Sequence, residues 1–353
     1  MGRGIFQSTL EQIEAGRSGK IMAVPTSLPK YNQYAYGTRQ QCYYLYGGET
    51  GTGKTRLARE QHIYEFYDYY KLVNDPKKLD VNFLDFSLEM SAQENMAAAI
   101  SRKLYLERGI VCSPEQILSI HGKLSDEVYE AIKSYRPYFE DFEKKLTVVE
   151  EDITPNKFHD ILMAYALKVG SFNTQGKYIS ECQGYTPNNP NMFHIILFDT
   201  VNLAELDSGH ETIKSSIDRI SRIAVWFRNK CGFTFIIIQQ FNSEISATDR
   251  ARYGIRTPLL RDFEDSKRTT KDANVVFGLF DATRHMREEE KLFMGYDISI
   301  MKSWFRSLHL LKHRGGQSNK VIPLQYKGAV GIFQQLPEVK EMDERQYTLH
   351  TRY

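Results

Sequence analysis

The stretch Gly48-Glu49-Thr50-Gly51-Thr52-Gly53-Lys54-Thr55 decides the fold, because it spells G-x-x-x-x-G-K-T. A β-prone run, Tyr43-Tyr44-Leu45-Tyr46, precedes it, and a helix-prone run that begins at Arg56 follows. This strand, loop and helix setting is the one in which the pattern holds phosphate. The glycines let successive N–H groups point at one anion, and the following helix adds its positive end. The sequence therefore predicts nucleotide binding from Gly48 to Arg56, with Lys54 on the β- and γ-phosphates and the Thr55 hydroxyl on Mg²⁺. The alternative is a glycine-rich turn that binds nothing.

The composition is that of an ordinary globular protein. Its 353 residues allow one large α/β domain or two smaller ones. No stretch approaches the ~18 apolar residues of a membrane span, and the start lacks a secretory signal, so no membrane partner is expected. The four cysteines lie far apart without a C-x-x-C pair, which indicates neither zinc nor disulfides and fits a cytoplasmic setting. A net charge of only +2 means that any nucleic-acid contact must come from a local patch.

Apolar runs alternate with helix-prone segments along the chain. Strands are expected at 43–46, 82–87, 146–149, 193–199, 233–240, 275–280, 308–312 and 321–326. Helices are expected at about 90–106, where Ser91 and Glu94 form a capping box, and at about 114–144, 155–169 and 211–230. The segment 173–191 is rich in Asn, Gly and Pro and predicts a surface loop. This alternation favours an α/β fold with a mainly parallel central sheet and helices on both faces.

Three regions follow from the pattern: an N-terminal arm at 1–40, the α/β body at 41–336, and a polar C-terminal tail at 337–353. In the arm, Ser8-Thr9-Leu10-Glu11 is a capping box and Gly16 a stop signal, which predicts a short helix with Phe6, Leu10 and Ile13 on one face. A helix this short is marginal alone in water. Its apolar face therefore packs either on its own domain or on a neighbouring subunit.

Polar residues close three of the predicted strands. In open α/β sheets ligands bind where the strands end, so these residues should meet the phosphate loop at one edge of the sheet. Asp199 is suited to hold Mg²⁺, Glu89 to orient and deprotonate the attacking water, and Gln240 to sense the γ-phosphate. The alternatives are a strand-end Asp that caps the next turn, a solvated turn glutamate and an uninvolved amide.

Two basic segments follow later in the chain. Lys312 and Arg314 end a strand with their side chains on the same side, and such cations can stabilise charge on a transferred phosphate. The segment 242–258 carries Arg250, Arg252 and Arg256 around a tyrosine, a combination that suits single-stranded nucleic acid. A solvated basic turn and an ordinary mobile loop are the respective alternatives.

From 21 to 336 these motifs, in order and spacing, resemble the ATPase domain of the DnaB-like hexameric replicative helicases. The most specific piece is Phe86-Ser87-Leu88-Glu89-Met90-Ser91-Ala92, which resembles the family's strand with the catalytic glutamate. Leu197-Phe198-Asp199, Ile238-Gln239-Gln240 and Lys312-His313-Arg314-Gly315 resemble other family motifs. The resemblance implies a RecA-like P-loop NTPase fold, ATP and Mg²⁺ as cofactors, Glu89 as general base, and Gln240 as γ-phosphate sensor. It also implies that Lys312 and Arg314 reach the nucleotide of the next subunit.

The function implied by the resemblance is an ATP-dependent DNA helicase of replication that forms a ring, six subunits being the family's number, and translocates on single-stranded DNA. The arm would dock on the adjacent subunit, and a loader or primase would be a partner. The family's N-terminal domain is not expected, because only about forty residues precede the phosphate loop; this favours a phage source over a bacterial one. Ser243 stands where the family has arginine. A RecA-like ATPase of recombination or repair and a nucleotide-dependent scaffold without unwinding activity are the alternatives.

Overall fold

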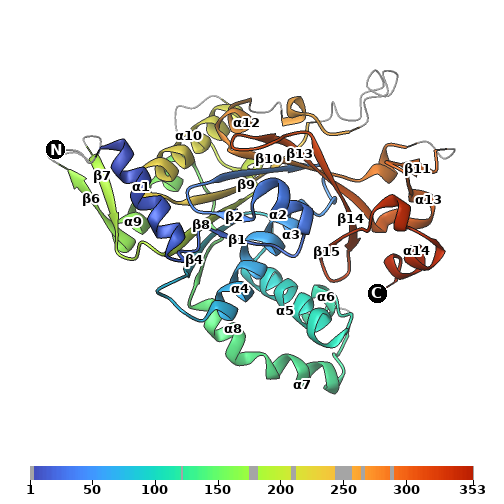
Figure 1. The fold of residues 1–353 in the computed structure, drawn as a ribbon. Coiled ribbons are helices and arrows are strands. Elements are labelled where there is room, and N and C mark those ends of the chain that lie inside the picture. Colours follow the sequence, from blue (N-terminus) through green and yellow to red (C-terminus); the bar gives the residue numbers. More distant parts are fainter. Residues whose placement is uncertain are drawn as a thin grey trace.

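The computed structural model describes residues 4–120, 122–174, 182–207, 212–242, 257–263, 267–286 and 290–352. Within them, a nine-stranded sheet runs in the order β15-β14-β13-β10-β3-β9-β8-β4-β5 (Figure 1). Its strands are β3 (Tyr43–Gly48), β4 (Asp80–Ser87), β5 (Leu146–Val149), β8 (Met192–Asp199), β9 (Thr234–Gln240), β10 (Val275–Phe280), β13 (Phe305–His313), β14 (Lys320–Lys327) and β15 (Ile332–Gln335). The strands from β10 to β5 are parallel, and β13, β14 and β15 are antiparallel. The prediction of a mainly parallel sheet is confirmed.

Helices cover both faces of this sheet. The first face carries α2 (Pro29–Ala35), α3 (Lys54–Arg59), the π-helix η1 (Glu60–Tyr64), α4 (Glu65–Val73), α5 (Ala92–Arg108), α6 (Pro114–Ile117), α7 (Asp126–Ser134) and α8 (Arg136–Glu143). The second carries α9 (Pro155–Val169), α10 (Ile213–Cys231) and α12 (Lys267–Asp272). Strand β3 feeds both cores, since Tyr44 and Tyr46 face the first and Tyr43 and Leu45 the second. A strand buried on both faces is therefore apolar throughout, as its sequence is.

The prediction of a surface loop at 173–191 is wrong in part. This segment contains most of an antiparallel hairpin formed by β6 (Gly170–Thr174) and β7 (Cys182–Pro187). The rings of Phe172 and Tyr185 pair across it at 5.0 Å, and Phe172 lies 5.9 Å from the Trp226 ring of α10. Aromatic packing thus outweighs the turn-forming composition around it.

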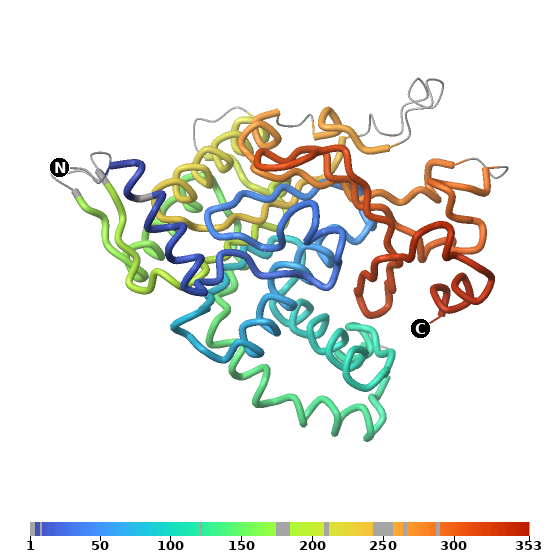
Figure 2. The backbone as a smooth tube through the Cα atoms, viewed as in Figure 1, coloured from blue at the N-terminus to red at the C-terminus, as the bar shows by residue number. Residues whose placement is uncertain are grey.

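The N-terminal arm has two parts with different burial. Helix α1 (Ile5–Arg17) begins at Ile5 after Gly4, ahead of the predicted cap at Ser8, and exposes 87% of Ile5 and 75% of Phe6. The remainder, with β1 (Ala23–Val24), α2 and β2 (Thr38–Arg39), belongs to the body, since Leu28 and Tyr31 are fully buried in its core. In Figure 2 the blue α1 and the red C-terminal segment lie at opposite sides of the molecule.

The C-terminal residues also contact the body. They form η8 (Val339–Glu341) and α14 (Glu344–His350), and the Gln325 side chain donates to the His350 carbonyl at 2.7 Å. The hydroxyl of Tyr347 accepts the backbone N–H of Asp297 next to a small core formed with β11 (Leu292–Phe293), β12 (Tyr296–Asp297) and α13 (Ile298–Met301). The remaining short turns are η3 (Val201–Leu203), η5 (Leu260–Phe263), η6 (Ala282–Arg284) and η7 (Lys302–Trp304). None of the described helices has the length and apolar character needed to cross a membrane.

Candidate functional site

The carboxyl ends of four neighbouring parallel strands meet at one edge of the sheet, which we call the carboxyl edge. In the strand register Gly48 pairs with Gln240 and Ser87 with Asp199. The turn that carries Glu89 is tied to the next strand, because Leu88 N–H donates to the Asp199 carbonyl at 2.9 Å. The predicted phosphate loop, Glu89, Asp199 and Gln240 are therefore brought together.

The phosphate loop turns into α3 through a glycine. Gly53 caps the helix with φ +96°, a left-handed conformation that side chains rarely adopt. Lys54 is the first helical residue and is only 4% exposed. Burial lowers the pKa of Lys54, while the charges of Glu89 and Asp199 act in the opposite direction. The ammonium group thus lies within the field of both carboxylates.

Thr55 and Asp199 form the predicted metal side of the site. The Thr55 hydroxyl donates to Asp199 Oδ1 at 3.0 Å, and Asp199 Oδ2 is buried with no hydrogen-bond partner. A hydroxyl and a carboxylate are the oxygen ligands that Mg²⁺ takes in nucleotide sites, with phosphates and water completing its shell. The residues present therefore fit this ion.

A buried arginine balances the charge beneath the metal side. Arg59 donates with both terminal nitrogens to the carboxylate of Asp85, and its Nη2 lies 3.8 Å from Asp199 Oδ2. All three residues are at most 3% exposed. Burial raises the pKa of Asp199 to about 6; Asp85 and Glu89 add to the rise, and Arg59 and the Thr55 hydrogen bond oppose it. The position therefore favours a bound cation, which would restore the ionised carboxylate.

Glu89 and Gln240 occupy different environments at the same edge. Glu89 is exposed, and the turn beneath it is fixed by the Ser91 and Glu94 capping box predicted from the sequence. Gln240 is half-buried, and its N–H donates to Asn202 Oδ1 at 2.8 Å. The adjacent Gln239 is fully buried and bonded to Thr269, so it belongs to the core.

A brace on the phosphate loop was not predicted from the sequence. Arg284 donates to the Thr50 carbonyl at 2.7 Å, His285 Nε2 lies 2.6 Å from Glu49 Oε2, and Arg306 Nε donates to the Thr52 carbonyl at 3.1 Å. Asp281 links the two arginines, at 3.2 Å from Arg284 Nε and 3.1 Å from Arg306 Nη2. Asp281 directly follows β10, so the rule used for Asp199 would have indicated it.

Lys312 and Arg314 lie at the opposite, amino edge of the sheet, because β13 runs antiparallel to β10. Both reach the carboxyl end of α12, where Lys312 Nζ donates to the Thr270 carbonyl at 2.6 Å and Arg314 to the Lys271 carbonyl. Burial and the charge of Arg314 lower the pKa of Lys312 to about 8.

The amino-edge cations are too far from the phosphate loop of their own chain to touch it. Arg314 N–H bonds to Asn274, whose N–H bonds to Tyr43 at the start of β3. The loop follows the other end of β3 at Gly48, about 17 Å away at ~3.3 Å per residue.

The arginines predicted to bind DNA, Arg250, Arg252 and Arg256, lie outside the described residues. The segments on either side of them are described. Asn242 N–H donates to the Asp262 carbonyl at 2.9 Å, so the chain returns to the end of β9 after this segment.

No protein-family model matches the chain, and no curated protein matches it. Two solved structures are similar to nearly all of it. The ATPase domain of another helicase has a TM-score of 0.70 at 18% identity, and the match covers 96% of this chain and all of that one. A DnaB-like replicative helicase, studied with its interactions with primase, has a TM-score of 0.65 at 16% identity over 94% of this chain and 67% of that one. The chain therefore has the RecA-like P-loop fold found in the ATPase domains of DnaB-like helicases.

Proposed function

We propose that the protein is an ATP-hydrolysing motor whose active sites form between subunits of a ring and which translocates on single-stranded DNA to unwind duplex. One observation carries the proposal. Lys54, Thr55, Glu89 and Asp199 meet at the carboxyl edge, whereas Arg314 is bound at the amino edge of the same sheet. A cation that cannot reach its own nucleotide can serve that of a neighbour.

The carboxyl edge has the groups that ATP hydrolysis needs. The loop N–H groups and Lys54 bind the β- and γ-phosphates. Glu89 takes a proton from the water that attacks the γ-phosphorus in line, and the γ-phosphate leaves the β-phosphate oxygen. Thr55 and Asp199 would hold Mg²⁺, which when bound neutralises charge that develops on the phosphate oxygens. The side chain of Gln240, next to Gly48 in the sheet, reports the presence of the γ-phosphate to the segment after β9.

The amino edge supplies the second half of the site. Arg314 is exposed and its side chain bonds only to a backbone carbonyl among the described residues, so it is free to turn toward a neighbouring molecule. Such an arginine contributes about 10³–10⁵ to kcat in related chemistry. A head-to-tail contact of this kind is heterologous and closes into a ring when the rotation fits.

Helix α1 provides the contact that would hold such a ring together. Its apolar residues Ile5, Phe6 and Ile13 are 87%, 75% and 52% exposed. An isolated helix of this length is marginal in water, so a partner surface on the adjacent subunit would stabilise it. Arg250, Arg252 and Arg256 are proposed to contact the DNA strand inside the ring, where phosphate binding would be salt-dependent.

Native mass spectrometry with and without a non-hydrolysable ATP analogue, paired with a forked-duplex unwinding assay, tests the proposal. We expect a closed oligomer, ATP turnover that single-stranded DNA accelerates, and strand separation that stops in Lys54→Ala. DNA-stimulated turnover without strand separation would favour a DNA-remodelling ATPase. A stable oligomer without turnover would favour a scaffold.

A further inference from the structure

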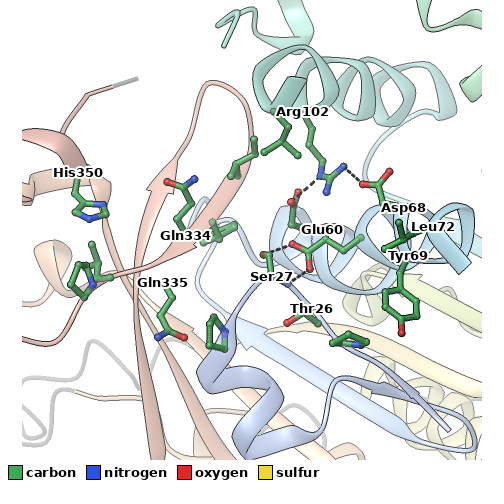
Figure 3. Close-up of a pocket in the computed structure, with 18 residues that line it drawn as sticks. Thr26, Ser27, Glu60, Asp68, Tyr69, Leu72, Arg102, Gln334, Gln335 and His350 are labelled. Carbon is green, nitrogen blue, oxygen red and sulfur yellow. Dashed lines mark hydrogen bonds and ion pairs between the residues drawn. The ribbon is translucent and has the colours of Figure 1, made fainter. Parts of the chain in front are cut away.

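A groove of about 940 Å³ runs beside β15 (Figure 3). Strand β15 lines one side along its whole length, and α4 with Leu72 and α5 with Arg102 line the other. The segment 25–29, ahead of α2, also lines it. We call it the β15 groove. It shares none of its lining residues with the carboxyl-edge site, and its volume suits a peptide or another ligand of similar bulk.

The backbone along the groove is that of an unpaired sheet edge. Strand β15 is the last strand of the sheet, and in the described part of the chain no strand pairs with its outer side. Leu336 N–H donates inward to the Pro323 carbonyl of β14 at 3.0 Å. Because inward and outward groups alternate in an antiparallel pair, Phe333 and Gln335 direct their N–H and C=O groups outward. Such an edge is a template for another strand.

The groove also has an excess of negative charge. Its three carboxylates, Glu60, Glu65 and Asp68, face one guanidinium, that of Arg102, which binds Glu60 and Asp68 at 2.8 Å each. Glu65 instead accepts from the N–H of Ser27 at 2.8 Å and from its hydroxyl. Glu60 is 3% and Glu65 9% exposed, and burial raises the pKa of both, that of Glu65 to about 7. A further cation beside them would stabilise their ionised forms.

Apolar side chains flank this charge at the rim of the groove. Leu72 is 79% and Leu106 49% exposed, so both present large apolar surfaces to solvent. In an extended strand alternate side chains project to the same side. A bound strand can therefore place one side chain among the carboxylates and its neighbours on the leucines.

We propose that the β15 groove binds an extended segment of a partner protein, which adds to β15 as a further strand. Its backbone pairs with Phe333 and Gln335, and a lysine or arginine of the segment enters among Glu60, Glu65 and Asp68. The unpaired edge favours a peptide over a small molecule, and the surplus carboxylates select its charge. This binding activity is separate from ATP hydrolysis.

The probe is a short fluorescein-labelled peptide of alternating valine and threonine with one central lysine, titrated by fluorescence anisotropy. We expect saturable binding, weakened at least tenfold when glutamate replaces the lysine. Because an added strand pairs along one edge only, N-methylation of the amides on that edge should abolish binding, and methylation of the alternate amides should preserve it. This comparison uses the unaltered protein, so no folding defect can imitate the result.

A charge variant tests the cation site. Glu65→Gln keeps the size of the side chain and should reduce the preference for lysine over glutamate several-fold, while the matched control Glu130→Gln on the exposed face of α7 should keep it. Absence of saturable binding of the lysine peptide, equal loss with both methylation patterns, or an unchanged preference in a folded Glu65→Gln protein would each overturn the proposal.

Discussion

Removing the buried cation beneath the metal side should be among the most destabilising single changes in the chain. In Arg59→Met the carboxylates of Asp85 and Asp199, 1% and 0% exposed, lose their shared guanidinium. Breaking a buried ion pair by removing one partner costs about 3–5 kcal/mol, because the remaining charge is left uncompensated. We therefore expect the free energy of unfolding to fall by that amount at pH 7.

A double-mutant cycle separates this charge effect from lost packing. Replacing both members of a buried pair by apolar groups is often nearly neutral. Arg59→Met with Asp85→Leu should therefore recover about half of the loss, the remainder reflecting the unbalanced Asp199. The assay is urea unfolding followed by circular dichroism. Lys133→Met, which breaks an exposed pair with Glu130, is the control and should leave the midpoint almost unchanged.

Two results would refute this reasoning. One is a cost below about 1 kcal/mol for Arg59→Met, which is the scale of an exposed ion pair. The other is simple additivity of the Arg59→Met and Asp85→Leu effects, which would mean that the two side chains do not interact energetically.

Three further predictions follow from named side chains. Glu89→Gln should lower kcat by about 10²–10⁴-fold at unchanged nucleotide affinity, by steady-state ATPase assay and nucleotide titration; retained turnover would exclude Glu89 as general base. Burial lowers the pKa of His62 to about 3 from an ordinary 6.5. The unfolded chain therefore takes up the proton first, and stability is full above pH ~6.5 and lost as the pH falls toward 3. His62→Gln should flatten that loss between pH 6.5 and 4.5 by up to about 1.4 kcal/mol per pH unit in denaturant titrations, and an unchanged slope would contradict it. Ser91→Ala removes the cap of α5 and should cost about 1 kcal/mol, whereas an unchanged midpoint would show that the capping box adds nothing.

The features that depend on local pattern were predictable from the sequence. Parallel strands buried on both faces are apolar throughout, so β3, β8 and β9 are evident as continuous runs. The rule that ligands meet strand ends then places Asp199 and Gln240 beside the phosphate loop. The capping box at Ser91 is likewise local, and it is present in the structure.

The remaining features depend on tertiary register, which periodicity does not encode. A strand pattern is the same in either direction, so the antiparallel course of β13, which puts Arg314 at the amino edge, is invisible in the sequence. The contact of His285 with Glu49 joins residues 236 positions apart. The β6–β7 hairpin depends on packing of Phe172 against Trp226, which the composition of 173–191 does not indicate.

The central claim is that each active site is shared between two subunits, and a mixing experiment tests it most directly. Lys54→Ala and Arg314→Ala proteins, each inactive alone, are combined in equal amounts, and mixed oligomers are verified by native mass spectrometry. Random head-to-tail contacts would give about a quarter of interfaces an intact Lys54 from one subunit and an intact Arg314 from the next, so about a quarter of the wild-type ATPase rate should return. No gain over the separate variants, in oligomers shown to be mixed, would contradict the shared site.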